Sequence, residues 1–186
     1  MHIAPVYFPV QFPVLKTERL ILRSIGAEDR TGVYRLYSDQ RVMQYRGEKT
    51  LTKNEECDEL LFHWKKIFAQ SAGIRWAIEW KQGNIFIGTA GIKKIEHVHH
   101  RGELGYELDP MWWNRGIMTE ALSAIIKYAV NEINLHSLEA NISPDNMPSR
   151  RVLEKLSFRN EGRFRENYFF EHWWDSEIWS YRKSIS

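Results

Sequence analysis

The chain has 186 residues, of which 43% are hydrophobic, 13% aromatic and 27% charged, with a formal net charge of +2. This length and composition are typical of one folded domain with a substantial core, and they argue against disorder. The near balance of charge gives no support to nucleic-acid binding, which usually concentrates basic residues on one face. No apolar run approaches the roughly 20 residues that a membrane span needs, so no membrane partner is expected.

Cysteine usage and the N-terminal segment point to a reducing compartment. Cys57 is the only cysteine, so no intrachain disulfide can form, which fits the cytoplasm best. It lies in the acidic segment NEECDELL, where a reactive thiolate is disfavoured. Residues 1–16 contain three prolines and lack the charged start of a signal peptide. We expect an extended arm there, followed by a single domain over residues 17–186.

The first half of the chain contains both strand and helix patterns. Leu20 and Leu22 share one face of the first predicted strand, and apolar residues recur at helical spacing between residues 53 and 70. The predicted elements of this half are a strand at 17–25, helices at 27–39 and 53–70, strands at 74–81, 84–97 and 103–109, and a hairpin turn at 82–84.

The second half begins with an amphipathic helix predicted over residues 116–134, whose apolar stripe contains Leu122, Ile125 and Ala129. The elements that follow are a strand at 135–143, a helix at 147–157 and a final antiparallel pair at 158–174 and 177–184. Together these elements predict an α+β domain around a mostly antiparallel sheet. One strand–helix–strand–helix passage lies in its second half.

An asparagine, an arginine and a glycine stand at the start of the predicted helix 116–134, in the segment WWNRGIMTEA. The first turn of a helix has N–H groups without intrahelical partners, and the helix dipole adds partial positive charge there. Gly116 lets an anion approach the backbone and Arg115 adds charge, so the segment predicts a pyrophosphate site. The alternative is a glycine that only eases a tight turn. Neither a GxGxxG nor a Walker pattern is present.

Five segments of the chain carry a family resemblance. They are TERLILRSIGAED (17–29), IGTAGI (87–92), GELGYELDP (102–110), WWNRGIMTEAL (112–122) and NMPSRRVLEKLSFRNEGRFRE (146–166). In this order they resemble the GNAT superfamily of acetyl-CoA-dependent N-acetyltransferases, and within it the branch of the ribosomal-protein N-terminal acetyltransferases RimJ and RimL. The resemblance covers about residues 17–184, and the joint match is more specific than any single segment.

The resemblance implies how the fold would bind acetyl-CoA. In GNAT proteins the central sheet, flanked by helices, splays open between two neighbouring strands, here 103–109 and 137–143, and the pantetheine arm lies in the opening. A backbone N–H there would polarise the acetyl carbonyl. The cofactor-binding residues that it implies are Glu107, Leu108 and Asp109 for the pantetheine, Asn114, Arg115, Gly116, Ile117, Met118 and Thr119 for the pyrophosphate, and Asn146 beyond the loop.

The chain departs from the family pattern at several positions. Asn114 and Met118 stand where family loops usually have Gly or Gln and Gly or Ala, but a backbone cradle does not need those side chains. Ser157 replaces a common glycine. Leu153 stands where many GNAT enzymes place a tyrosine thought to protonate the departing thiolate, so that role is unfilled. Ser149, which matches a serine of the RimJ/RimL branch, is the replacement candidate; the alternative is a helix-start residue with a local backbone bond.

The reaction needs a neutral amine, because the nitrogen attacks the thioester carbonyl and a base must remove a proton. Glu103 is the first choice for this base, because the RimJ/RimL branch often has a carboxylate there. Strand alternation puts Glu103 and Glu107 on one face and Tyr106 on the other. The alternative is that Glu103 is a solvated carboxylate at a sheet edge.

Two further features invite a functional interpretation. His97 and His99 would share a strand face, as a two-histidine metal site requires. Histidines in a polar hairpin loop are more often solvated, so we expect no metal. The aromatic segment 168–181 resembles a stacking platform for bases or sugars, but core packing or a wall of the amine site is the favoured interpretation.

We therefore predict a cytoplasmic enzyme that moves acetyl from acetyl-CoA to a primary amine by direct transfer in a ternary complex. The resemblance favours a protein N-terminal α-amine; the alternative acceptor is a small amine such as a polyamine, an amino acid or an antibiotic. Because the tyrosine is missing at position 153, a non-catalytic acyl-CoA-binding module is a second hypothesis. A nucleotide-phosphate binder is a third. The sequence leaves homodimer formation open.

Overall fold

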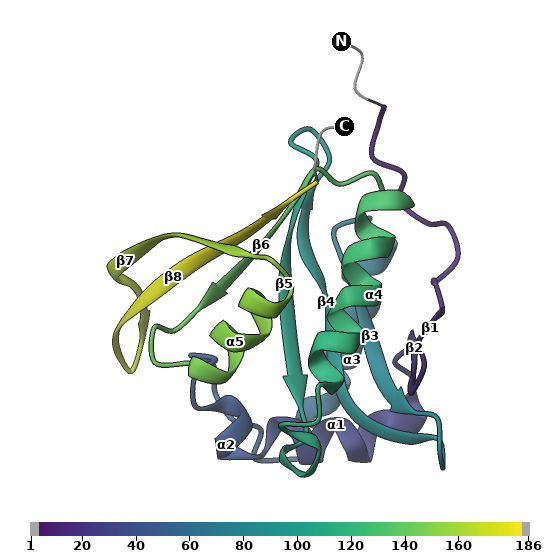
Figure 1. The fold of residues 1–186 in the computed structure, drawn as a ribbon. Coiled ribbons are helices and arrows are strands. Elements are labelled where there is room, and N and C mark those ends of the chain that lie inside the picture. The colour runs from purple at the N-terminus through teal and green to yellow at the C-terminus, as the bar shows by residue number, and fades with distance from the viewer. Residues whose placement is uncertain (1–3, 184–186) are drawn as a thin grey trace.

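The computed structural model describes residues 4–183, which form one eight-stranded sheet flanked by helices (Figure 1). The strand order is β1-β2-β3-β4-β5-β6-β8-β7, and every neighbouring pair is antiparallel except β5–β6. The strands are β1 (Leu15–Lys16), β2 (Leu20–Ser24), β3 (Ile74–Trp80), β4 (Ile85–Glu96), β5 (Arg101–Leu108), β6 (Ser137–Ile142), β7 (Arg159–Phe170) and β8 (His172–Arg182). The helices are α1 (Arg30–Tyr37), α2 (Gln40–Met43), α3 (Glu56–Ala69), α4 (Ile117–Asn131) and α5 (Met147–Lys155). The predicted α+β class is confirmed.

Helices lie against both faces of the sheet (Figure 1). The face under α4 and α5, called here the α4/α5 face, holds the larger apolar core. Leu22, Trp76 and Ile92 contribute to that core from the strands, and Leu122 and Ile125 contribute from α4. The opposite face, called the α1/α3 face, carries a smaller apolar cluster and several buried charged groups. Each face of β5 therefore meets a different chemical environment.

Helix α4 forms where the apolar spacing predicts it, and its stripe Leu122, Ile125 and Ala129 is fully buried. The helix ends at Asn131, three residues before the predicted limit. Asn134 has a φ of 65°, a left-handed conformation that asparagine and glycine adopt after helix ends. The chain therefore turns there and enters β6.

The N-terminal segment is extended, and the described part of it packs on the domain. The Tyr7 N–H donates to the Ile133 carbonyl oxygen at 2.9 Å. The Trp76 indole N–H donates to the Pro13 carbonyl oxygen at 2.8 Å. These contacts fasten the segment to the turn after α4 and to β3. Residues 1–3 of the predicted arm lie outside the described residues.

The final antiparallel pair exists, but its predicted turn is wrong. The chain reverses at Glu171, which has a φ of 58°, so that Phe170 pairs with His172. The segment 172–174, which the prediction assigned to the first strand, belongs to β8. Position 184 of the predicted second strand lies outside the described residues. Because both strands are aromatic and charged throughout, composition alone did not mark the reversal.

The aromatic residues of this hairpin do not all join the core. Trp179 is 5% exposed and lies in the core, as predicted. Phe169 and Trp173 pair across the hairpin at 5.3 Å between ring centroids, yet they are 62% and 58% exposed. Core packing is therefore the wrong interpretation for these two residues. Near its tip, the hairpin touches the segment after α2, where the Tyr168 hydroxyl donates to the Gly47 carbonyl oxygen.

We expect Leu122→Ala to lower the free energy of unfolding by about 2–5 kcal/mol, because the substitution leaves a cavity under α4. Urea denaturation followed by circular dichroism measures this change. Ser123→Ala is the matched control, since Ser123 is exposed on the same helix and its substitution should change stability by less than about 0.5 kcal/mol. Equal effects from the two variants would contradict the assignment of the buried stripe.

Candidate active site

The parallel strands β5 and β6 separate part-way along their length. Their pairs run from Arg101–Ser137 to Leu104–Ala140. Beyond these pairs β5 continues beside β4, and β6 continues beside β8. The divergence leaves an opening, called here the β5–β6 opening, where the splay was predicted. Because a helix follows each of these two parallel strands, the N-termini of α4 and α5 lie on the side of the sheet where β5 and β6 end (Figure 1).

The backbone of β5 faces this opening at alternate residues. The Asp109 N–H donates to a β4 carbonyl oxygen at 2.9 Å. Hydrogen-bonded pairs recur at every second residue of an antiparallel ladder, so Asp109 and Glu107 direct their backbone groups at β4. Leu108 and Tyr106 direct theirs at the opening. Of the three residues predicted to bind pantetheine, Leu108 is the one whose backbone faces the opening.

The loop and first turn of α4, residues 114–119, have a backbone suited to an anion. Asn114 and Gly116 have φ values of 60° and 71°, and asparagine tolerates this left-handed region better than most residues. Asn114 can therefore occupy a position where family loops often have glycine. Met118 is 7% exposed and packs in the core. Its side chain therefore packs into the core and not at the exposed start of the helix.

Three residues, called here the Thr17–Arg19–Glu120 clamp, hold the start of α4. Thr17 Oγ1 and the Arg19 backbone N–H donate to Glu120 Oε1 at 2.5 and 2.9 Å. Arg19 Nε donates to Glu120 Oε2 at 2.6 Å, and Arg19 Nη1 donates to the Arg115 carbonyl oxygen at 3.0 Å. An unpaired glutamate in the first turn would repel a bound anion. The Arg19 guanidinium offsets that charge and fixes the loop.

The start of α5 is fixed by a side-chain cap. Asn146 Oδ1 accepts a hydrogen bond from the Ser149 N–H at 3.1 Å, the usual role of an N-cap asparagine. Leu153 is fully buried in the core, so position 153 brings no hydroxyl to the opening. Ser157 has a φ of 63°, which explains in physical terms why a glycine is common there.

Tyr106 extends from β5 toward α5 on the α4/α5 face. Its ring packs against the core, and its hydroxyl oxygen is buried. Within residues 4–183 that oxygen has no hydrogen-bond partner. Burial raises the pKa of Tyr106 to about 12, and the nearby Ser149 hydroxyl offsets part of that effect. Strand alternation indicated which face Tyr106 occupies, but no feature of the sequence indicated a buried hydroxyl.

On the α1/α3 face, the Glu107 carboxylate lies in a buried polar network. It accepts hydrogen bonds from Arg46, Arg75, the Tyr37 hydroxyl at 2.8 Å and the Thr89 hydroxyl at 3.1 Å. Two guanidinium groups favour the ionised carboxylate. The Glu107 side chain therefore ties α1 and β3 to the part of β5 that borders the opening.

Glu103 lies on the same face, near the point where β5 and β6 part. Its carboxylate oxygens are 2.9 and 2.8 Å from the ammonium groups of Lys93 and Lys94. Burial raises the pKa of Glu103, but the hydrogen bonds from Lys94 and Lys93 outweigh it and hold the pKa below its usual value. Glu103 lines a hollow of about 250 Å³ together with Glu139 and Asn141 of β6. It is a paired, partly buried carboxylate rather than a solvated one.

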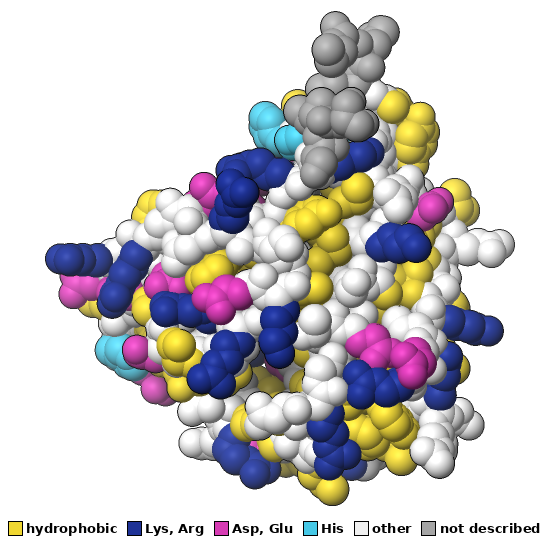
Figure 2. Space-filling model, in the orientation of Figure 1, with side chains coloured by type: hydrophobic (Ala, Val, Ile, Leu, Met, Phe, Trp, Pro, Cys, Tyr) yellow, Lys and Arg dark blue, Asp and Glu magenta, His cyan; other side chains and the backbone are white. Residues whose placement is uncertain are grey.

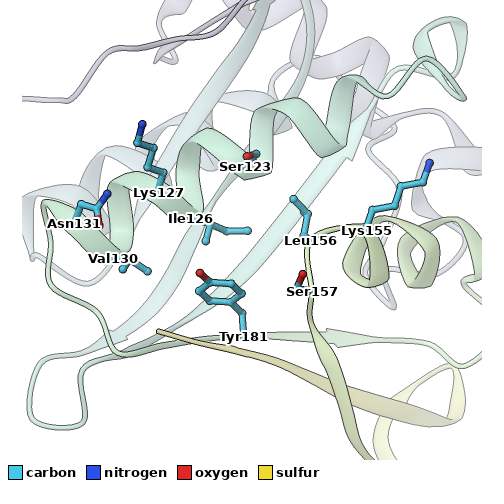
Figure 3. A pocket seen from close by; sticks show the side chains of 9 residues that line it. All are labelled: Ser123, Ile126, Lys127, Val130, Asn131, Lys155, Leu156, Ser157 and Tyr181. Atoms are coloured by element: carbon cyan, nitrogen blue, oxygen red, sulfur yellow. The ribbon is translucent and has the colours of Figure 1, made fainter. Parts of the chain in front are cut away.

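A second hollow, of about 370 Å³, lies between the later part of α4, the end of α5 and β8 (Figure 3). Ile126, Val130 and Tyr181 line it, and the ammonium groups of Lys127 and Lys155 point away from it (Figure 3). Ser123, Asn131 and Ser157 also line it. This hollow is also separate from the helix starts that border the β5–β6 opening.

The sequence predicted no concentrated basic face, no metal site and no membrane span. Basic and acidic side chains are interspersed on the face that carries α4 and α5 (Figure 2). Within residues 4–183 there is no cluster of three or more His, Cys, Asp or Glu side chains that could hold a metal ion. His97 Nε2 instead bonds the Ser71 carbonyl oxygen at 2.8 Å. In the same part of the chain, no helix is long and apolar enough to cross a membrane.

Cys57 is buried among the side chains of the α1/α3 face. Burial raises the pKa of its thiol, so the reactive thiolate is disfavoured. The structure therefore agrees with the expectation that Cys57 is not a nucleophile.

We expect Glu120→Gln to lower the free energy of unfolding by about 1–2 kcal/mol at pH 7, because charge-assisted hydrogen bonds are lost. Burial raises the pKa of Glu120, but Thr17 and Arg19 outweigh it and lower the pKa overall. Because the pKa of Glu120 is lower in the folded state, its ionised form stabilises the fold at pH values above its pKa in the unfolded chain, roughly 4.3. This stabilisation is lost as the pH falls through the pKa of Glu120 in the folded state.

The difference in the free energy of unfolding between the wild type and Glu120→Gln should accordingly become smaller at acidic pH. Urea denaturation at pH values between about 3 and 7 measures this difference. Glu132→Gln, at the exposed far end of α4, is the matched control and should show no loss at pH 7. A deficit that stays constant down to pH 3 would contradict the ion-pair role of Glu120.

Comparison with known proteins agrees with this geometry. The family described as "Acetyltransferase (GNAT) domain" matches residues 19–159. The uncharacterized N-acetyltransferase YoaA of Bacillus subtilis (strain 168) is 31% identical over 91% of this chain and 96% of its own. A GNAT-family acetyltransferase from Bacillus anthracis superposes with a TM-score of 0.81 at 28% identity, over 91% of this chain and 98% of the other. RimL in complex with coenzyme A shares the fold, with a TM-score of 0.83 at 17% identity over 91% and 98% of the two chains. This chain therefore belongs to the GNAT family and is an acetyl-CoA-dependent N-acetyltransferase.

Proposed function

We propose that the enzyme acetylates the α-amino group of a polypeptide N-terminus by direct transfer in a ternary complex. Residues 17–186 act as one catalytic domain in this proposal, with residues 1–16 as its arm. The proposed coenzyme site comprises Glu107, Leu108 and Asp109 on β5, Asn114, Arg115, Gly116, Ile117, Met118 and Thr119 at the start of α4, and Asn146 at the start of α5. Glu103 and Ser149 are the proposed catalytic residues.

The coenzyme fits the α4/α5 face of the opening. The first-turn N–H groups of α4 suit a pyrophosphate, and the Thr17–Arg19–Glu120 clamp limits repulsion by the one acidic residue of that turn. The Arg115 guanidinium lies 5.4 Å from the Trp112 ring centroid, which keeps its positive charge beside the loop. The backbone of Leu108 offers an N–H that can polarise the acetyl carbonyl.

The acceptor amine approaches from the opposite face in this proposal. A pantetheine arm on the α4/α5 face would block entry from that side. The thioester carbonyl would then be open toward the α1/α3 face, where Glu103 and Glu107 lie. The hollow beside Glu103 gives an amine or a bridging water access to that carboxylate.

The pairing of Glu103 with Lys93 and Lys94 is the observation that favours an α-amine. A carboxylate with a lowered pKa is a weak base, so the reaction draws on the fraction of the acceptor that is already deprotonated in solution. An α-amino group has a pKa of about 7.7–8.0, whereas a lysine-type alkyl ammonium has one of about 10.4. At neutral pH the α-amine therefore supplies far more of the reactive form than an alkyl amine does.

Two kinds of acceptor appear among the similar proteins. A ribosomal protein uS5-alanine N-acetyltransferase of Escherichia coli is 32% identical over 50% of this chain and 48% of its own. A spermidine N(1)-acetyltransferase of Vibrio cholerae is 23% identical over 81% of this chain and 85% of its own. A small amine is thus the alternative acceptor. The weak base at Glu103 favours a protein α-amine over a polyamine such as spermidine.

Location and assembly complete the proposal. The single cysteine, which is buried and free, is consistent with an enzyme that acts in the reducing cytoplasm. The exposed side chains of Phe169 and Trp173 offer a surface for a homodimer contact. Gel filtration of the wild type beside a Phe169→Ser, Trp173→Ser double variant tests that contact.

We expect a peptide with an unblocked N-terminus to be acetylated at pH 7 with a kcat/KM at least tenfold above that of spermidine. Spermidine turnover should rise about tenfold per pH unit between pH 7 and 9, because the ammonium must lose its proton first. Release of coenzyme A thiol follows the reaction. The same peptide with a blocked N-terminus and one lysine is the matched control, and it should behave like spermidine. A preference for spermidine at pH 7 would contradict the proposal.

We expect Glu103→Gln to lower kcat about a hundredfold, the lower end of what a general base contributes, and to leave acetyl-CoA affinity unchanged in calorimetry. Glu139→Gln is the matched control, because Glu139 lines the same hollow from β6. Unchanged turnover in Glu103→Gln would remove Glu103 from the mechanism. A wild type that binds acetyl-CoA and transfers to none of these amines would instead favour the non-catalytic binding module.

A further inference from the structure

The guanidinium group of Arg19 lies beside the loop that precedes α4, and two of its three nitrogens hold that region together. Nε donates to Glu120 Oε2 at 2.6 Å, and Nη1 donates to the Arg115 carbonyl oxygen at 3.0 Å. The third nitrogen, Nη2, lies 3.8 Å from the point where a side chain on Gly116 would begin. The Arg19 side chain is 35% exposed, so a ligand can reach it from solvent.

Gly116 leaves an open space beside this nitrogen. Its φ of 71° is left-handed. Among the described residues other than its own chain neighbours, Arg19 Nη2 is the one group that comes within 4 Å of a Cβ built on Gly116. The loop backbone therefore borders this space on one side, and Nη2 borders it on another. An anion that approaches the first-turn N–H groups of α4 past the glycine comes within reach of Nη2.

Two indole rings keep a second guanidinium group at the same loop. The Arg19 guanidinium carbon lies 5.9 Å from the Trp80 ring centroid, and the Arg115 guanidinium carbon lies 5.4 Å from that of Trp112. The two rings pack together with their centroids 4.9 Å apart. Contacts of this kind favour a cation beside the ring face. Glu120 offsets one of the two positive charges, and the other remains available to a ligand.

We propose that Arg19 Nη2 donates a hydrogen bond to a pyrophosphate oxygen of coenzyme A, so that a residue about a hundred positions before α4 binds the coenzyme directly. This inference rests on the proposed function, because it requires the pyrophosphate to lie at the start of α4. It gives Arg19 a second role beside its part in the Thr17–Arg19–Glu120 clamp, where it offsets the charge of Glu120.

The two roles of Arg19 make different predictions. If Arg19 only offsets the Glu120 carboxylate, removing both charges together restores the electrostatic balance of the loop. If Nη2 binds the phosphate, the double variant still lacks a charge-assisted hydrogen bond and binds weakly. Arg19→Lys separates the roles in a second way, because one ammonium group can pair with Glu120 but does not reproduce the fork of guanidinium nitrogens.

The test compares acetyl-CoA with acetyl-pantetheine, which carries the same thioester without the pyrophosphate and the nucleotide. Calorimetry measures acetyl-CoA, and titration at millimolar concentrations measures acetyl-pantetheine. The double variant Arg19→Gln, Glu120→Gln and the single variant Arg19→Lys should each bind acetyl-CoA about tenfold or more weakly than the wild type, the effect expected for a lost hydrogen bond between charged groups. Both variants should bind acetyl-pantetheine as the wild type does.

Lys81→Gln is the matched control, since the Lys81 ammonium donates to the Glu18 carbonyl oxygen at 3.1 Å. This variant removes a positive charge from the segment next to Arg19, and it should change acetyl-CoA affinity by less than about threefold, because an exposed charge without ligand contact is screened.

Chemical modification of arginine by phenylglyoxal, mapped by mass spectrometry, needs no variant. Coenzyme A should protect Arg19 of the wild type from modification, and acetyl-pantetheine should not. Equal modification of Arg19 with and without coenzyme A would overturn the inference even if the variants did not fold.

Three other outcomes are decisive. Wild-type affinity for acetyl-CoA in the double variant would make Arg19 only an offset for Glu120 and overturn the inference. An equal loss of both ligands in Arg19→Lys would make Arg19 a packing residue and also overturn it. A wild type that binds acetyl-CoA no more tightly than acetyl-pantetheine would remove the pyrophosphate from the start of α4. That result would overturn the proposed coenzyme site itself, whichever amine is the acceptor, which separates the two failures.

Discussion

The end of pairing between β5 and β6 after Leu104–Ala140 is the constraint on which the site depends. Each strand keeps its ladder with the neighbour on its other side, so the divergence leaves one edge of β5 directed at the opening. Backbone groups at such an edge need partners. The fold thus leaves backbone groups of β5 without a β6 partner, with the starts of two helices following these strands.

In the proposed mechanism, the two faces of β5 have separate tasks. On the α4/α5 face, the starts of α4 and α5 present N–H donors, which suit an anionic ligand. On the α1/α3 face, Glu103 and Glu107 are held by lysine and arginine side chains. In the proposed mechanism, the pairing with Lys93 and Lys94 makes Glu103 a weak base. The choice among acceptor amines would then rest on the acidity of the incoming ammonium group.

Long-range contacts keep this arrangement in register. Glu120 joins the first turn of α4 to Thr17 and Arg19, about a hundred positions earlier in the chain. Glu107 joins β5 to Arg46, which follows α2. Both links are charge-assisted and partly or fully buried, so breaking either leaves an uncompensated charge. The anion loop and the acceptor wall are therefore positioned by segments that lie far from them in the sequence.

The local sequence pattern predicted most helices and strands, the anion-suited start of α4 and the family. These features depend on the spacing of apolar residues, on turn residues and on the order of motifs, all of which are properties of consecutive positions. It failed at Glu171, where the reversal had no distinctive composition. Only the tertiary structure decided that Leu108 and Tyr106 face the opening and that two lysines hold Glu103. The first depends on which β5 residues form the hydrogen-bonded pairs with β4, and the second depends on side chains from separate segments. Neither can be predicted from a single stretch of the chain.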